Sequence, residues 1–245
     1  MPSPRELVFA FEGYVVDYAE HYLCPKGWFE SVRTRESVDG SGPCPWITYP
    51  ALMVLDRIVR PHYRVLEYGS GSSSLWWRSR VQQLVSVEHD SEWSSRLALN
   101  PSPNHTLHEV PAEAPLKPER AELLEREFFG AGLDPAPAGD PERKVRSVRC
   151  REFAAYASQV LDYGPGYFDV IVIDGMARVL TAWLAARVLN PSGFILFDNS
   201  DRDVYRAAYD ILAREGFRRI DFWGTGPINP YESCTSIFTR TLEVF

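Results

Sequence analysis

Residues 64–76 read Arg-Val-Leu-Glu-Tyr-Gly-Ser-Gly-Ser-Ser-Ser-Leu-Trp, and this stretch decides the fold. Its apolar start predicts a short buried strand that ends in Glu67. The two glycines after it predict a tight turn that opens a helix. Because Gly69 and Gly71 have no Cβ, a ligand can approach the backbone there, and the N–H groups from Ser70 to Ser73 face the same space. The segment therefore predicts a cradle for a small molecule.

Glycine turns of this kind are typical of nucleotide sites, but two residues depart from that pattern. Position 74, where a dinucleotide fold has its third glycine, is Ser74, and the carboxylate of Glu67 would repel a pyrophosphate. That carboxylate suits a cationic ligand instead. Glu88 ends a second apolar run about twenty residues after the turn, the spacing at which a Rossmann-type fold places a carboxylate for ribose hydroxyls. The alternative is that Glu88 only caps the segment 89–93.

The pattern Glu67-x-Gly69-x-Gly71 resembles the first motif of class I S-adenosylmethionine-dependent methyltransferases. The resemblance covers residues 60–240 apart from an insertion, and it implies a methyltransferase with S-adenosylmethionine as cofactor. It also implies cofactor contacts from the region before the first strand, which in this family often folds over the ligand. The residues that we expect to bind the cofactor are Glu67, Gly69, Ser70, Gly71, Ser73, Glu88, His89, Trp46, Thr48 and Asp174.

Strand and helix patterns alternate along the chain, which predicts a doubly wound, mostly parallel α/β sheet. We expect seven strands, at 64–67, 83–88, 105–110, 168–173, 193–197, 217–223 and 234–239, the last one antiparallel at the edge. We expect helices at 51–59, 73–80, 119–129, 154–161, 177–189 and 201–215, the last with Ser200 as N-cap and Gly216 as its stop. Residues 1–60 would form an N-terminal helical cap or lid, and 61–245 the catalytic domain, with an insertion at 112–150 after the third strand.

Polar residues follow two of the predicted strands directly. Asp174 comes after the run Val-Ile-Val-Ile, and Asp198 and Asn199 come after Phe-Ile-Leu-Phe. In an open α/β sheet these strand ends face the ligand crevice. Two carboxylates and an amide suit Mg²⁺, and the arrangement resembles the metal site of catechol-type O-methyltransferases. The other interpretation has no metal, and Asp174 then holds the methionine amine or orients the nucleophile.

The expected reaction is O-methylation of a small metabolite. We expect Asp174, Arg178 and Tyr49 to take part in catalysis, and an arginine at the crevice, Arg178 or Arg202, would bind an anionic acceptor. The loop 224–233 would form one wall of the acceptor pocket. Other readings stay open: an enzyme that cyclises or cleaves the methionine arm of the same cofactor, a nicotinamide-dependent oxidoreductase, or a non-catalytic binding protein.

Composition and charge narrow the classes of partner and cellular location that the protein can have. The chain has 245 residues and a net charge of −7, with acids and bases interspersed, which disfavours nucleic acid as a partner. No apolar run is long enough to span a bilayer, and the four scattered cysteines predict neither a zinc site nor a disulfide framework. We therefore expect a cytoplasmic protein without a membrane segment. The sequence leaves the oligomeric state open, a homodimer included.

Overall fold

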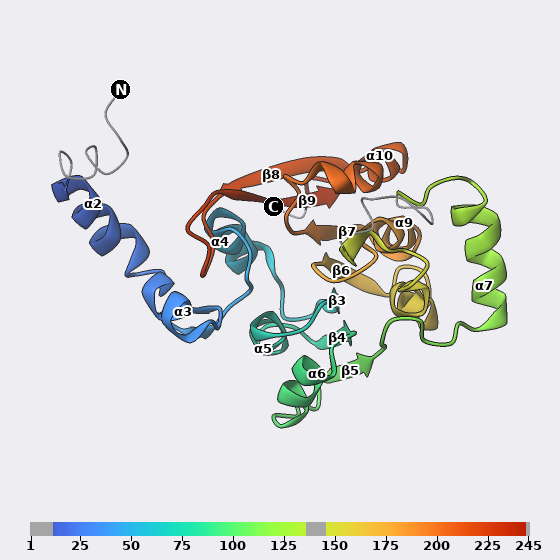
Figure 1. The fold of residues 1–245 in the computed structure, drawn as a ribbon, viewed down its shortest axis with the longest axis horizontal. Helices are drawn as coiled ribbons and strands as arrows, with labels where there is room; N and C mark the ends of the chain where they lie inside the picture. The colour runs from blue at the N-terminus through green and yellow to red at the C-terminus, as the bar shows by residue number, and fades with distance from the viewer. Residues whose placement is uncertain (1–11, 136–145, 244–245) are drawn as a thin grey trace.

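The computed structural model describes residues 12–135 and 146–243. Within them the main sheet has seven strands in the order β5-β4-β3-β6-β7-β9-β8. Figure 1 shows this sheet across the middle of the molecule, with helices on both sides. The strand bounds are β3 Arg64–Tyr68, β4 Gln83–Glu88, β5 His105–Glu109, β6 Phe168–Ile173, β7 Leu189–Phe197, β8 Arg218–Gly224 and β9 Ser233–Thr239.

The predicted fold class is confirmed, with one correction to the sheet order. The last strand, β9, is antiparallel to both of its neighbours, as expected. It does not lie at the edge, however, because β9 pairs with β7 on one side and β8 on the other, and β8 is the edge strand. The burial of the two strands agrees with these positions. Every residue of β9 is buried, whereas the residues of β8 are exposed or half-buried, as they can be in an edge strand.

Alternating apolar residues in the strands build two cores, one on each face of the sheet. Val65, for example, packs on one face and Leu66 on the other. The first face is covered by α4 (Tyr49–Ile58) and α5 (Ser72–Arg78). The second is covered by α8 (Ala154–Ala157), α9 (Arg178–Val188) and α10 (Arg206–Arg214). Helix α6 (Ser91–Ala98) contacts β4 and β5.

Three helices differ from the predictions. The expected helix 154–161 changes after α8 into a 3-10 helix, Ser158–Asp162, and the expected helix 119–129 is α7 (Pro118–Leu124) followed by a π-helix, Glu125–Phe129. The expected helix 201–215 begins with a 3-10 helix, Asp203–Tyr205, before α10. Ser200 is not the N-cap of this helix, because its hydroxyl is hydrogen-bonded to Cys234 and Ser236 of β9. Gly216 stops α10 as predicted, with φ of 83°.

The N-terminal segment consists of α2 (Glu12–Tyr18), a π-helix (Ala19–Leu23), α3 (Trp28–Thr34) and a hairpin of β1 (Val38–Asp39) and β2 (Gly42–Pro43). In Figure 1 α2 and α3 project from one side of the sheet, and α7 lies at the opposite side of the view. The insertion packs through Leu124 and Phe128 onto the α9 side of the core. Its residues 136–145, with part of the Pro/Gly/Ala tract, lie outside the described residues, as do residues 1–11. No helix in the described ranges could span a bilayer.

Candidate functional site

The carboxyl ends of the parallel strands open into two adjoining cavities. The first, of about 200 Å³, is lined by the glycine turn 69–73, by Glu88 and His89, and by residues 174–176. The second, of about 430 Å³, lies over the ends of β6 and β7 and is lined by Asp198, Asn199 and Arg202. Four residues line both cavities: Trp46, Ser70, Trp93 and Asp174. A ligand in the first cavity would therefore share a wall with a ligand in the second.

The glycine turn is held against the end of β6 by backbone contact. Gly69 has φ of 89°, and a Cβ there would lie 3.1 Å from the carbonyl carbon of Asp174. On the other side a Cβ on Gly175 would lie 1.9 Å from the Tyr156 hydroxyl oxygen and 2.9 Å from the nitrogen of Gly69. Gly69 and Gly175 are thus both needed for the two loops to meet. Gly175 is a residue that the sequence analysis did not single out.

Glu67 lies beneath the turn and lines neither cavity. Its side chain is completely buried, and Oε2 accepts hydrogen bonds from the hydroxyls of Ser74, at 2.5 Å, and Ser86, at 2.9 Å. Oε1 is buried without a partner of hydrogen-bond geometry in the described ranges. Burial raises the pKa of Glu67 to about 7, although the nearby serine hydroxyls oppose that rise. Glu67 therefore supports the turn from below, and its predicted direct contact with a ligand is not seen in this geometry.

Glu88, in contrast, lines the first cavity as a fixed anion. Its Oε2 accepts from the backbone N–H and the hydroxyl of Ser70, at 2.7 and 3.0 Å. Its Oε1 accepts from the backbone N–H groups of His89 and Asp90, at 2.7 and 2.9 Å. Burial alone would raise the pKa of Glu88, but the contact with the His89 ring and these backbone donors outweigh it and hold the pKa below its ordinary value. Glu88 is not merely a helix cap, because Asp90 caps α6.

Arg178 ties the ends of β6 and β7 together from below the crevice. Its guanidinium donates to the backbone oxygens of Asp174, Gly175 and Asp198, and Nη2 donates to Asp174 Oδ1 at 2.8 Å. The side chain is buried and lines neither cavity. The structure therefore gives no support to the expectation that Arg178 binds an acceptor. Because α9 begins at this residue, the side chain turns back under the loop instead of out of it.

The carboxyl of Asp198 faces the second cavity in a different environment from that of Asp174. Thr235 donates its hydroxyl to Asp198 Oδ1 at 2.6 Å, and the Thr235 oxygen in turn accepts the backbone N–H of Thr48. Burial and the nearby carboxylate of Asp174 raise the pKa of Asp198 to about 7. Burial also raises the pKa of Asp174, but the bound guanidinium of Arg178 opposes that rise. The two carboxyls therefore titrate as an interacting pair.

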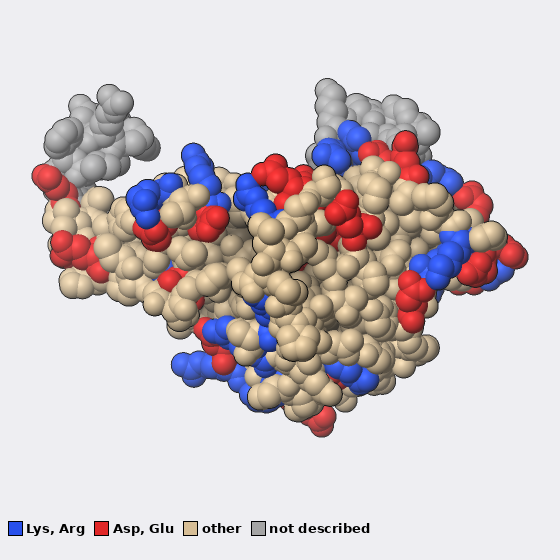
Figure 2. All heavy atoms as spheres, turned by 90° about the horizontal axis from the view of Figure 1, so that it is seen from below, with Lys and Arg blue, Asp and Glu red and all other residues tan. Residues whose placement is uncertain are grey.

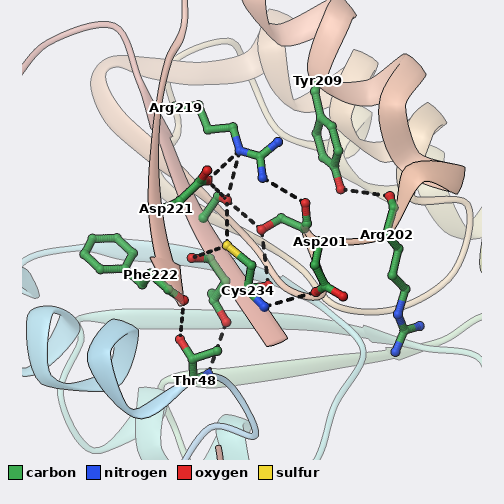
Figure 3. A network of polar contacts seen from close by, with 11 residues as sticks. Thr48, Asp201, Arg202, Tyr209, Arg219, Asp221, Phe222 and Cys234 are labelled. Carbon is green, nitrogen blue, oxygen red and sulfur yellow. Dashed lines mark hydrogen bonds and ion pairs between the residues drawn. The ribbon is translucent and has the colours of Figure 1, made fainter. Parts of the chain in front are cut away.

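A polar network joins the loop after β7 to β8 and β9, next to the second cavity (Figure 3). Asp201 Oδ1 accepts the backbone N–H of Cys234, and Arg219 donates to the backbone oxygen of Ser200. These bonds hold the loop after β7 against β9. The guanidinium of Arg202 points away from this network in Figure 3 and contributes to the lining of the second cavity.

Two residues expected at the site lie elsewhere. Tyr49 is buried at the start of α4 and lines a different cavity, where its ring packs near Lys26. Thr48 is buried and is used to join the N-terminal segment to β8, since its hydroxyl donates to the backbone oxygen of Phe222 (Figure 3). The structure gives no support to the catalytic role expected of Tyr49. Trp46, by contrast, is half-exposed and lines both cavities.

Several lining residues were not singled out from the sequence. Arg35, Glu36 and Ser37 reach the first cavity from the N-terminal segment, and Trp93 lines both cavities from α6. The only sequence signal for Trp93 is its place one helical turn after the strand that ends in Glu88. The loop 224–233 contributes Gly226, Asn229, Tyr231 and Ser233 to the second cavity. The described part of the insertion 112–150 lines neither cavity.

The arrangement of Asp174, Asp198 and Asn199 does not fit a resident Mg²⁺ well. The Asp174 carboxylate is already paired with Arg178, and Thr235 donates to Asp198. The described ranges contain no group of three or more His, Cys, Asp or Glu residues placed to hold a metal ion. The catechol-type metal site is not supported.

The strand order and the reversed last strand can now be compared with known proteins. No protein-family model matches the sequence, and no curated protein matches it. Among solved structures, precorrin 8w decarboxylase from Methanobacterium thermoautotrophicum is similar at a TM-score of 0.50 and 13% identity, over 84% of this chain and 97% of that chain. The fold is that of class I methyltransferases. This likeness shows the architecture alone.

Two further similar structures have methyltransferase in their names. A TehB-like SAM-dependent methyltransferase from Corynebacterium glutamicum has a TM-score of 0.46 and 10% identity, over 94% of this chain and 100% of that chain. A methyltransferase-like protein from Silicibacter pomeroyi has a TM-score of 0.44 and 19% identity, over 82% of this chain and 91% of that chain.

Proposed function

We propose that this class I methyltransferase-like protein binds S-adenosylmethionine and transfers its methyl group to a hydroxyl of a small acceptor. The observation that carries the proposal is the pair of adjoining cavities with Asp174 in their common wall. The first cavity has a glycine-lined side and the fixed carboxylate of Glu88, which suit a nucleoside with an amino-acid arm. The second has a protonatable acid, Asp198, and polar side chains that suit a small polar molecule.

The residues of the first cavity fit the cofactor. Glu88 is ionised, and its carboxylate is held in place by backbone donors, so that it can accept hydrogen bonds from ribose hydroxyls once the Ser70 hydroxyl turns aside. Gly71 presents bare backbone to the cavity beside the Trp93 ring, and a Cβ there would make only an ordinary contact with that ring, at 3.8 Å. The bound cofactor would supply an already activated methyl group, so that the protein's tasks are orientation and proton removal.

Asp198 is the residue that accepts the proton of the acceptor hydroxyl. Thr235 must donate its single hydroxyl hydrogen to Asp198, because its oxygen accepts the N–H of Thr48. The Thr235 hydroxyl thereby fixes Oδ1, and the carboxyl, which also meets the backbone N–H of Asn199, lines the cavity in which the acceptor would lie. A pKa of about 7 keeps a useful fraction of Asp198 ionised at neutral pH and also makes it a competent base. This role takes the place of metal activation.

Arg202 is the cation that would bind an anionic group of the acceptor. It lines the second cavity, and its positive charge lowers the pKa of Asp174. A small acceptor also agrees with the surface: on the face in Figure 2, Lys and Arg side chains alternate with Asp and Glu, and neither sign forms a continuous patch. Such a face favours a metabolite over a nucleic acid.

Calorimetry with S-adenosylhomocysteine tests cofactor binding, and we expect saturable binding that weakens in Glu88→Gln. Incubation with S-adenosylmethionine and a panel of small hydroxylated acids then tests the reaction. S-adenosylhomocysteine as product, with full turnover in excess chelator, supports the proposal. Methylthioadenosine as product would indicate chemistry on the methionine arm instead, and loss of turnover on chelation would restore the metal hypothesis.

A further inference from the structure

The N-terminal segment contributes two charged side chains to the cavity proposed for the cofactor. Arg35, Glu36 and Ser37 line this cavity together with the glycine turn, although more than thirty positions separate them along the chain. Ser37 is buried, and its backbone oxygen accepts the N–H of Cys44. Ser31 bonds both the N–H and the carbonyl of Val38. These contacts lie outside the cavity and hold the segment in place without a ligand.

The position of Arg35 is set by the end of α3. Arg35 is the residue that follows this helix, with φ of 62°, and its N–H donates to the carbonyl of Ser31. Glycine is the usual residue at such a left-handed position, where other residues are strained by about 1 kcal/mol or more. The backbone therefore gives no reason for an arginine here. The side chain must be understood from what surrounds it.

The charges that line this cavity are unbalanced. Within the described ranges its lining carries three carboxyl groups, on Glu36, Glu88 and Asp174, and one cation, Arg35. Glu88 is satisfied by backbone donors and Asp174 by Arg178. In the same ranges no hydrogen bond, ion pair or ring contact engages the guanidinium of Arg35, whereas Arg33, two residues earlier, is paired with Glu30.

We propose that Arg35 binds the carboxylate of the cofactor's methionine arm. This inference rests on the proposed function, because it requires S-adenosylmethionine in the first cavity. The arm ends in an ammonium and a carboxylate. The ammonium suits the acids of the cavity, but those same acids repel the carboxylate unless a cation meets it. A guanidinium offers two parallel N–H donors to a carboxylate, which makes Arg35 the matching group.

The proposal extends the role expected for the N-terminal segment. Besides Trp46, a residue near the end of α3 would contribute directly to cofactor affinity. A bound cofactor would also link two parts of the chain, because its arm would contact the N-terminal segment on one side and the glycine turn on the other. Salt should weaken this contact, since Arg35 is exposed.

The test compares two ligands by calorimetry, S-adenosylhomocysteine and methylthioadenosine, which lacks the amino-acid end. The variant is Arg35→Gly, which the left-handed backbone accepts, so that a failure to fold is not expected. Arg33→Ala is the matched control, since it removes a neighbouring charge that lines neither cavity. We expect Arg35→Gly to weaken S-adenosylhomocysteine binding about 10-fold or more and methylthioadenosine binding less than 2-fold, with both ligands unaffected by Arg33→Ala.

The outcomes separate this inference from the proposed function. If the unmodified protein binds no S-adenosylhomocysteine, the proposed function itself fails. If it does bind, and Arg35→Gly leaves that affinity unchanged, only the role of Arg35 is overturned. An equal loss for both ligands in Arg35→Gly would also overturn it, because the effect would then not depend on the carboxylate. Partial recovery in Arg35→Lys, with a steeper salt dependence than in Arg35→Gly, would support it further.

Discussion

Replacing Glu67 by glutamine should change how stability depends on pH. Glu67 is completely buried, and its pKa rises from an ordinary value of 4.5 to about 7. Between these pH values the folded protein holds a proton that the unfolded chain has released, so stability falls as the pH rises from 4.5 to about 7 and levels off above that. At about 1.4 kcal/mol per pKa unit, this shift lowers the free energy of unfolding by ~3 kcal/mol over that pH range.

Glutamine cannot ionise and has the shape of the protonated acid. Its amide oxygen can accept the hydroxyls of Ser74 and Ser86 that now reach Oε2. The amide nitrogen would take the place of the buried, unpartnered Oε1, where the protonated acid also carries its hydrogen. We therefore expect Glu67→Gln to be close to the parent protein near pH 4.5 and more stable by up to ~3 kcal/mol near pH 8.

Urea denaturation at a series of pH values measures this difference, because urea leaves ionic strength unchanged. Asp198 contributes a pH dependence of the same sign, but it is present in both proteins and cancels in the comparison. The control is Glu109→Gln, an exposed residue at the end of β5, which should shift stability by less than about 0.5 kcal/mol at every pH. A difference between Glu67→Gln and the parent that stays constant from pH 4.5 to 8 would refute the reasoning.

Three further outcomes follow from the site. Gly175→Ala should destabilise the protein by about 2 kcal/mol or more, because its Cβ would meet the Tyr156 hydroxyl, and Tyr156→Phe should recover part of the loss in thermal unfolding. Asp198→Asn should lower kcat/KM about 100-fold or more and leave the affinity for S-adenosylhomocysteine unchanged. The rate of the parent protein should rise with pH through about 7, and a pH-independent rate would count against a base role for Asp198. Arg178→Met should lower the free energy of unfolding in urea by about 3 kcal/mol or more, since it leaves the Asp174 carboxylate and two buried carbonyls unpaired. A loss under about 1 kcal/mol would show that water replaces these bonds.

The strands and the strand-end acids could be predicted from the sequence because they depend on local pattern. The run 170–173 is apolar on both faces of a parallel sheet, and Asp174 follows at once. The partners of these acids depend on pairings between distant segments. Ser86 reaches Glu67 because the two residues are register partners on β3 and β4, and no local pattern encodes that match. The glycine turn, in contrast, could be predicted from its own residues alone.

Tyr49 and Arg178 depart from their expected places for the same physical reason, the direction of a side chain on a helix. Tyr49 begins α4, and its ring turns toward Lys26 and away from the crevice. Arg178 begins α9 and turns under the strand ends. Both positions are close in sequence to the crevice, but helix phase, which a short apolar pattern leaves undetermined, decides which way they point. The place of β9 likewise depends on Ile237 packing between Leu196 and Ile220, a choice among long-range pairings.

The place of β9 also determines when the sheet can be completed. Strands β7 and β8 share no pairing in the described sheet, because β9 lies between them, although both precede it in the chain. During synthesis, or in a chain cut before Ser233, each of them therefore presents a free row of N–H and C=O groups. Such rows can pair with the same strands of another molecule, and β9 of a second chain fits the gap equally well. Folding of this protein is thus exposed to strand exchange until residues 233–239 arrive, and the buried side chains of β9 then close the sheet.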